Sequence, residues 1–98
     1  MIWNLRIEPV AQRETRVALA FYSTRDPKLA DRFTRKLEKT LEAIHANPHR
    51  WAEVEDDIRE AIVDGWPFAI YYRLDTDWIS VFAIFNTSRD PQEWMNRI

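Results

Sequence analysis

Three strand-like runs dominate the second half of the sequence, and only short links separate them. They are rich in β-branched and aromatic residues and comprise Ile58–Val63, Phe68–Leu74 and Trp78–Asn86. The links contain the turn-forming strings Asp64-Gly65 and Asp75-Thr76-Asp77. Since a parallel crossover needs about a dozen residues or more, links this short predict an antiparallel meander.

The second and third runs differ in how their apolar residues are distributed. Every second side chain of the run Phe68–Leu74 forms one apolar face, made of Phe68, Ile70, Tyr72 and Leu74. Trp78–Asn86 is instead apolar on both faces, which is typical of a strand that is covered on each side. We therefore expect Trp78–Asn86 to be the central strand.

A short strand and a first helix are predicted at the start of the chain. Ile2–Glu8 alternates apolar and polar side chains with the period of a half-buried strand, which Pro9 ends. The next apolar residues, from Val10 to about Tyr22, fall near one side of a helix. They include Val10, Val17, Phe21 and the alanines at positions 11, 18 and 20.

A second helix has the clearest pattern in the sequence. Asp26 is a suitable N-cap, Pro27 suits the first turn, and Asn47-Pro48 ends the helix. Apolar residues recur every three or four positions at Leu29, Phe33, Leu37, Leu41 and Ile44. Residues 23–26 would join the two helices as an antiparallel hairpin.

The remaining segments are an acidic connector and a terminal helix. Residues 53–57 read as a polar link before the first strand of the meander. Asp90, Pro91 and Glu93 are arranged as at the start of a helix, which would continue through Trp94 to Arg97. The predicted order is β-α-α-β-β-β-α, an α+β fold with the helical hairpin on one face of the sheet, in a single domain of residues 1–98.

Composition limits the classes of function. The 98 residues contain no Cys, so disulfides and thiolate metal sites are excluded. The formal net charge of −2 lacks the basic excess of avid nucleic-acid binders. No apolar run approaches membrane-spanning length, so we expect a soluble cytoplasmic protein without membrane attachment.

Several strings of residues resemble the RelE/ParE toxin superfamily, and the resemblance covers almost the whole chain. They are the long helix that ends in Asn47-Pro48, the Arg-bearing strand Ile58-Arg59-Glu60-Ala61, the hairpin string Trp66-Pro67-Phe68-Ala69-Ile70-Tyr71-Tyr72-Arg73, and Arg89-Asp90-Pro91 followed by Trp94. The resemblance implies the toxin of a type II toxin–antitoxin pair, with an antitoxin as its partner. It also leaves open a homodimer or a heterotetramer with that antitoxin.

The two branches of this superfamily differ in mechanism, and two positions favour the ParE-like branch. RelE relatives cleave mRNA on the ribosome, whereas ParE relatives inhibit DNA gyrase and lack the ribonuclease residues. Phe68 stands where ribonuclease members place an arginine, and Asn86 stands where related sequences often place a histidine. Neither side chain can stabilise phosphate as a cation or transfer a proton near neutral pH.

Three residues are the remaining candidates for catalysis. Arg59, Arg89 and Tyr71 would have to converge on one phosphate for the ribonuclease alternative to hold. For each arginine, the competing interpretation is a structural ion pair: Arg59 lies among the carboxylates of residues 53–60, and Arg89 could tie the terminal segment to the sheet. Since adjacent strand residues point to opposite faces, Tyr71 and Tyr72 cannot form one site.

Other candidates concern binding to partners. Arg89 and Trp94 could contact a target protein, although Trp94 could equally clamp the terminal helix onto the core. A basic stripe on the second helix, which is the solvated face of that helix or a seat for an acidic antitoxin segment, consists of Arg32, Arg35, Lys36 and Lys39. No cofactor is implied, and we expect no metal site because Asn47-Pro48 separates His45 from His49.

Three functions therefore stay open at this stage. The favoured one is a ParE-like toxin that binds a protein target such as gyrase. The second is a ribosome-dependent endoribonuclease, and the third is an inactive relative that retains only antitoxin binding.

Overall fold

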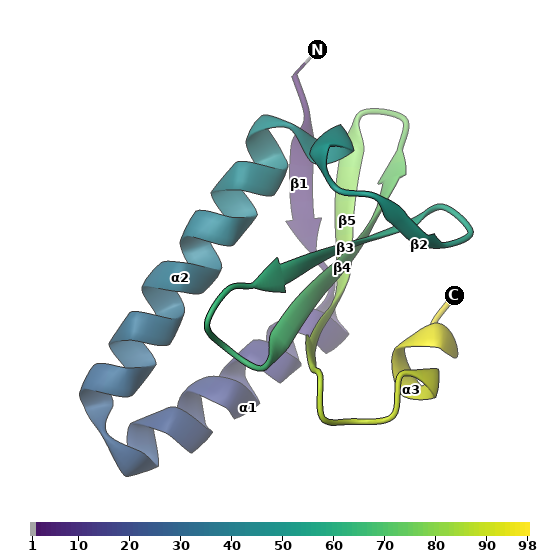
Figure 1. Cartoon of the computed structure of the whole chain (residues 1–98). Helices are drawn as coiled ribbons and strands as arrows, with labels where there is room; N and C mark the ends of the chain where they lie inside the picture. Colours follow the sequence, from purple (N-terminus) through teal and green to yellow (C-terminus); the bar gives the residue numbers. More distant parts are fainter. Residues whose placement is uncertain (1) are drawn as a thin grey trace.

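The computed structural model describes residues 2–98 and contains a five-stranded sheet with helices on both faces (Figure 1). In chain order, the elements are β1 (Asn4–Ile7), α1 (Pro9–Arg25), α2 (Pro27–Ala46), the 3-10 turn η1 (Pro48–Arg50), β2 (Glu53–Glu55), β3 (Ile58–Val63), β4 (Phe68–Asp75), β5 (Trp78–Asn86) and α3 (Gln92–Met95). The predicted meander and the predicted helical hairpin are both confirmed.

The strand order of the sheet is β1-β5-β4-β3-β2. β1 runs parallel to β5, while the other neighbours are antiparallel. β5 is an interior strand, as its two apolar faces predict, but the expectation that it is central is wrong. β4 occupies the middle position because an additional strand, β2, extends the far edge.

Two segments differ from the sequence-based expectation because apolar periodicity does not mark them. The acidic connector contains β2, whose three residues are all exposed and so carry no burial pattern. α1 continues to Arg25, so Asp26 alone joins the two helices, rather than residues 23–26. Asp26 caps α2 as predicted, since its carboxylate accepts a hydrogen bond of 3.0 Å from the Lys28 backbone N–H.

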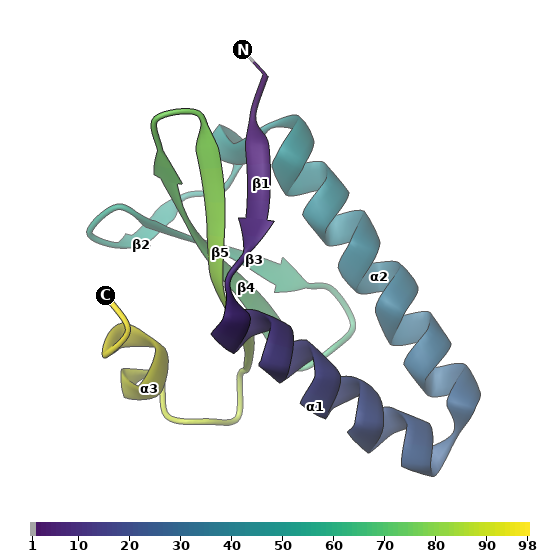
Figure 2. The same ribbon diagram turned by 180° about the vertical axis from the view of Figure 1, so that it is seen from behind.

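Each face of the sheet has its own core. α1 and α2 pack on one face through buried residues such as Ala18, Phe33 and Ile44. α3 packs on the opposite face, where Trp94 joins the buried group of Tyr71 and Phe85. Figure 2 shows the molecule from behind, with α3 apart from the helical hairpin.

No helix within residues 2–98 combines the length and the apolar character that crossing a membrane requires.

Candidate functional site

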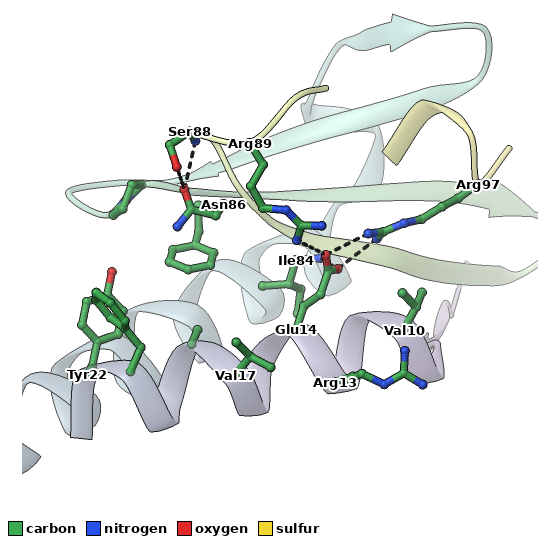
Figure 3. A pocket seen from close by; sticks show the side chains of 14 residues that line it. Val10, Arg13, Glu14, Val17, Tyr22, Ile84, Asn86, Ser88, Arg89 and Arg97 are labelled. Carbon is green, nitrogen blue, oxygen red and sulfur yellow. Dashed lines mark hydrogen bonds and ion pairs between the residues drawn. The ribbon is translucent and has the colours of Figure 1, made fainter. Parts of the chain in front are cut away.

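A groove lies between α1, the end of β5 and the segment that follows β5 (Figure 3). Its volume is about 640 Å³. The lining is mainly apolar, with three arginines, and consists of Val10, Arg13, Glu14, Val17, Ala18, Phe21, Tyr22, Pro67, Phe68, Ile84, Asn86, Ser88, Arg89 and Arg97. An apolar surface with a few charged groups is suited to binding another molecule.

One wall of the groove is a stripe of α1 residues that leaves large apolar side chains in solvent. Val17 is 65% exposed and Phe21 is 50% exposed, whereas Ala11 and Ala18 are buried. The apolar side of α1 is therefore wider than its contact with the core. The apolar residues predicted to fall near one side of the helix thus divide between the core, which receives Ala11 and Ala18, and the groove, which Val17 and Phe21 line.

Glu14 lies at the centre of this groove and is almost enclosed, with 11% of its side chain exposed. Its two carboxylate oxygens accept hydrogen bonds from Arg97 Nη1 at 3.0 Å and Arg97 Nη2 at 2.9 Å. The backbone N–H of Ile84 donates to the same carboxylate at 3.1 Å. Glu14 thus ties α1 to β5 and to the last turn of the chain.

These contacts supply hydrogen-bond partners to backbone groups on an unpaired edge of the sheet. β1 accompanies β5 only as far as Val81, because the chain turns into α1 at Pro9. Beyond that point, Glu14 accepts the N–H of Ile84, and Arg97 donates to the Phe82 carbonyl at 3.2 Å. The ion pair Glu14–Arg97 therefore replaces a neighbouring strand and covers an edge that could otherwise pair with another chain.

Arg89 belongs to the same network but is more accessible. Its guanidinium contacts Glu14 at 3.3 Å, pairs with Glu93, and lies 4.8 Å from the ring centre of Phe85. Its side chain is 44% exposed. The structural interpretation of Arg89, an ion pair that fixes the terminal segment, is confirmed.

Arg59 lies at a different site, on the face of the sheet that α1 and α2 cover. It donates to the Trp51 carbonyl at 2.5 Å and forms an ion pair with Glu53 at 3.2 Å. The partner of Arg59 across β3 and β4 is Tyr72, not Tyr71. Arg59 thus holds the connector and β2 against the sheet, as its structural interpretation predicts.

The two adjacent tyrosines point to opposite faces, as predicted. Tyr72 is fully buried and donates to the Pro48 carbonyl at 2.7 Å, and burial raises its pKa to about 12. Tyr71 donates to Glu60 at 2.6 Å. Burial, reinforced by that hydrogen bond, raises the pKa of Tyr71 above its usual range. Both phenols remain protonated at neutral pH.

The three catalytic candidates therefore do not converge. Arg59 lies on the face that α1 and α2 cover and Tyr71 on the face that α3 covers, while Arg89 follows the end of β5 and is paired with Glu14 and Glu93. Asn86 accepts a hydrogen bond from the Ser88 N–H at 2.9 Å and shapes the loop after β5.

Trp94 is 3% exposed and stacks on Tyr71 with ring centres 4.1 Å apart. The clamp interpretation fits this position, because a buried indole offers no surface to a target. The expectation that Trp94 contacts a partner directly therefore needs correction.

The basic stripe is on the outer side of α2. Arg32, Arg35 and Lys39 are exposed and Lys36 is half-buried, and none of the four lines the groove. Among residues 2–98, none of them forms an ion pair with a carboxylate.

The histidines do not form a metal site within the described part of the chain. His45 Nε2 lies 2.6 Å from the Trp3 carbonyl oxygen, and the ring of His49 meets the Trp3 ring edge-on at 5.7 Å. Residues 2–98 contain no group of three or more potential ligands placed around one ion.

Comparison with known proteins assigns the chain to a family. No curated protein matches it. Its fold resembles a solved chain of the chromosomal ParDE toxin–antitoxin system from P. aeruginosa, with a TM-score of 0.76 over 87% of this chain and 96% of that chain. At 17% identity, that likeness shows the fold alone. Residues 5–91 match the ParE toxin of type II toxin–antitoxin systems, parDE, so the chain belongs to the ParE toxin family.

Proposed function

We propose that this toxin stops growth by binding a protein target, DNA gyrase, and that a cognate antitoxin neutralises it in the cytoplasm. The family match supports the pairing of toxin and antitoxin. Gyrase is the target that the ParE-like resemblance implies. The stoichiometry we expect is a heterotetramer with the antitoxin, which light scattering of the purified complex would test.

One observation carries this proposal more than any other: the residues that ribonuclease chemistry needs are apart and already engaged. Arg59 and Arg89 are each paired with carboxylates. Tyr71 and Tyr72 are hydrogen-bonded phenols whose pKa values are raised, so neither supplies a base near neutral pH. A groove with exposed apolar side chains instead supports protein binding.

The test is a supercoiling assay with purified gyrase and the purified toxin. We expect loss of supercoiling at toxin concentrations comparable to those of the enzyme, and recovery when antitoxin is added. Induction in cells should trigger the DNA-damage response. Unchanged supercoiling at concentrations that stop growth would rule out gyrase as the target.

Mapping of mRNA 5′ ends after induction distinguishes the ribonuclease alternative from the proposed binding of gyrase. Under the proposal, no codon-positioned cuts appear, and Arg59→Gln changes only folding stability. Cuts that disappear in Arg59→Gln would identify a ribosome-dependent nuclease instead.

A further inference from the structure

We infer that the basic stripe on α2 contacts the phosphate backbone of duplex DNA while the toxin is bound to its target. This inference rests on the proposed function, because gyrase is an enzyme that holds DNA. The toxin then binds two components of one complex, the gyrase protein and the DNA beside it.

The basic stripe is a compact row of cations that Lys28 extends by one turn. At the angular step of an α-helix, Lys28 and the four residues of the stripe fall within about 100° of the circumference of α2. They extend over residues 28–39, or roughly 16 Å along the helix axis. Because one strand of B-DNA rises about 3.4 Å per phosphate, the row is as long as about five successive phosphates.

These cations are open to an incoming anion. None of them forms an ion pair with a carboxylate within residues 2–98. Asp31 lies one turn before Arg35, but an ion pair at that spacing on an exposed helix is weak and would not hold Arg35 back. Figure 1 shows α2 along the outer margin of the molecule, where a duplex can reach it.

The outer side of α2 has no apolar anchor for a protein partner. The exposed large apolar residues of the described chain all belong to other segments: Ile2, Val17, Phe21, Val54, Ile62, Trp78 and Ile98. A protein interface derives most of its affinity from a few side chains that fill well-packed pockets, whereas contacts with phosphate require only cations and hydrogen-bond donors. Charge without apolar surface therefore favours a nucleic-acid backbone over an acidic protein segment.

The charge of the remaining chain determines how tightly free DNA is bound. The formal net charge is −2, so the residues other than these five cations carry −7 in total. We therefore expect weak binding of free DNA, which is measurable only at low salt. A duplex that gyrase already holds beside the toxin has a high effective concentration, and there the same contacts increase the affinity.

The first experiment measures the affinity of the full-length toxin for gyrase with and without bound DNA. Arg32→Gln/Arg35→Gln removes two cations of the basic stripe, and glutamine preserves helix propensity, so the fold should survive. The control Arg50→Gln/Arg73→Gln removes the same charge from η1 and β4. Circular dichroism checks that both variants are folded.

Wild-type toxin and the control should bind DNA-bound gyrase more tightly than DNA-free gyrase. The stripe variant should lose at least about tenfold in affinity for DNA-bound gyrase and stay within about twofold for DNA-free gyrase, since only the phosphate contacts are removed. The slope of log affinity against log salt concentration for DNA-bound gyrase should fall by about 2, one for each lost contact.

A second experiment does not require gyrase. Fluorescence anisotropy of a fluorescein-labelled DNA duplex at low salt measures binding of the toxin to DNA alone. The stripe variant should bind at least about tenfold more weakly than the control, although both have the same net charge. Glu38→Gln, three residues after Arg35, removes a nearby carboxylate and should tighten binding of the duplex.

The possible results separate the basic stripe from the proposed target. A stripe variant that matches the control on DNA-bound gyrase and on the free duplex would overturn the inference. So would a stripe variant that keeps its DNA affinity but loses affinity for the antitoxin in calorimetry, which would assign the stripe to an acidic protein segment. If wild-type toxin binds gyrase in neither state, the proposed target is refuted, and the free-duplex measurement alone decides whether the stripe binds DNA.

Discussion

Replacing Glu14 by Ala should destabilise the fold more than any other single change to a charged residue. The substitution removes the bidentate partner of Arg97, one partner of Arg89 and the acceptor of the Ile84 N–H. It leaves a guanidinium with 19% of its side chain exposed and a backbone donor unpaired. The cost should therefore come from desolvated groups that have lost their partners.

The magnitude follows from the burial of each contact. Removing one member of a fully buried pair costs roughly 3–5 kcal/mol, whereas an exposed pair contributes about 0–1 kcal/mol. The pair Glu14–Arg97 is close to the first case, and the contact with Arg89, which is 44% exposed, is close to the second. We expect a loss of about 2–3 kcal/mol in the free energy of unfolding, or roughly 10–20 °C in Tm for a domain of this size.

Urea unfolding followed by circular dichroism measures this loss. Glu14→Gln keeps an acceptor for Ile84 while it removes the charge, so its loss should be smaller than that of Glu14→Ala. Glu38→Ala, at an exposed position of α2, is the control and should leave the midpoint nearly unchanged. A double-mutant cycle with Arg97→Met isolates the pair. If Glu14→Ala costs less than about 0.5 kcal/mol, the ion pair contributes no more than a surface pair and the reasoning fails.

The remaining predictions concern the aromatic side chains. Trp94→Ala should lower the free energy of unfolding by about 3–5 kcal/mol, because Trp94 is the buried anchor of α3. Hydrogen exchange should become faster in α3. Exchange unchanged from wild type would contradict the role of Trp94 as a clamp. Tyr72→Phe should cost about 1 kcal/mol in urea unfolding, since the Pro48 carbonyl loses its donor. Burial raises the pKa of Tyr71 above its ordinary value and that of Tyr72 to about 12. The protonated phenols therefore contribute stability that is complete below about pH 10 and lost as the pH rises through the folded pKa values. Absorbance titration should show phenolate formation at higher pH in the folded than in the denatured protein; coincident curves would refute the burial.

The elements that could be predicted correctly from the sequence are those marked by local signals. α2 has one apolar stripe and a capping aspartate, and both features act within a single helix. The meander follows from links too short for a crossover, which is a limit set by chain geometry. These signals are local, so no knowledge of the tertiary structure was needed to read them.

The elements that were missed depend on partners distant in the sequence. β2 is a strand only because β3 pairs with it, and its three exposed residues show no alternation. The middle position of β4 is a consequence of that extra strand. The Glu14 network likewise joins residues 83 positions apart, Glu14 and Arg97, which no periodicity can reveal.

α1 shows how a correct pattern can lead to an incomplete interpretation. Its apolar residues do fall near one side, but that side is wide enough for two contacts. The small alanines, Ala11 and Ala18, allow the helix to approach the core closely, while Val17 and Phe21 turn toward the groove. The apolar side of α1 is wider than the core surface that the helix contacts. That extra width is the signal in the sequence that could have indicated a second contact.

The groove and the ion pair within it have a common structural origin. Because β1 is only four residues long, the chain leaves the sheet at Pro9 and continues as α1, so β5 extends beyond its neighbour. The exposed edge of β5 then needs side-chain partners, which Glu14 and Arg97 provide. The space beside that edge, which a longer strand would have filled, remains open as the groove. A substitution that weakens the ion pair should therefore lower the free energy of unfolding, whereas Val17→Glu, at a side chain that is 65% exposed in the wall of the groove, should change it by less than about 0.5 kcal/mol.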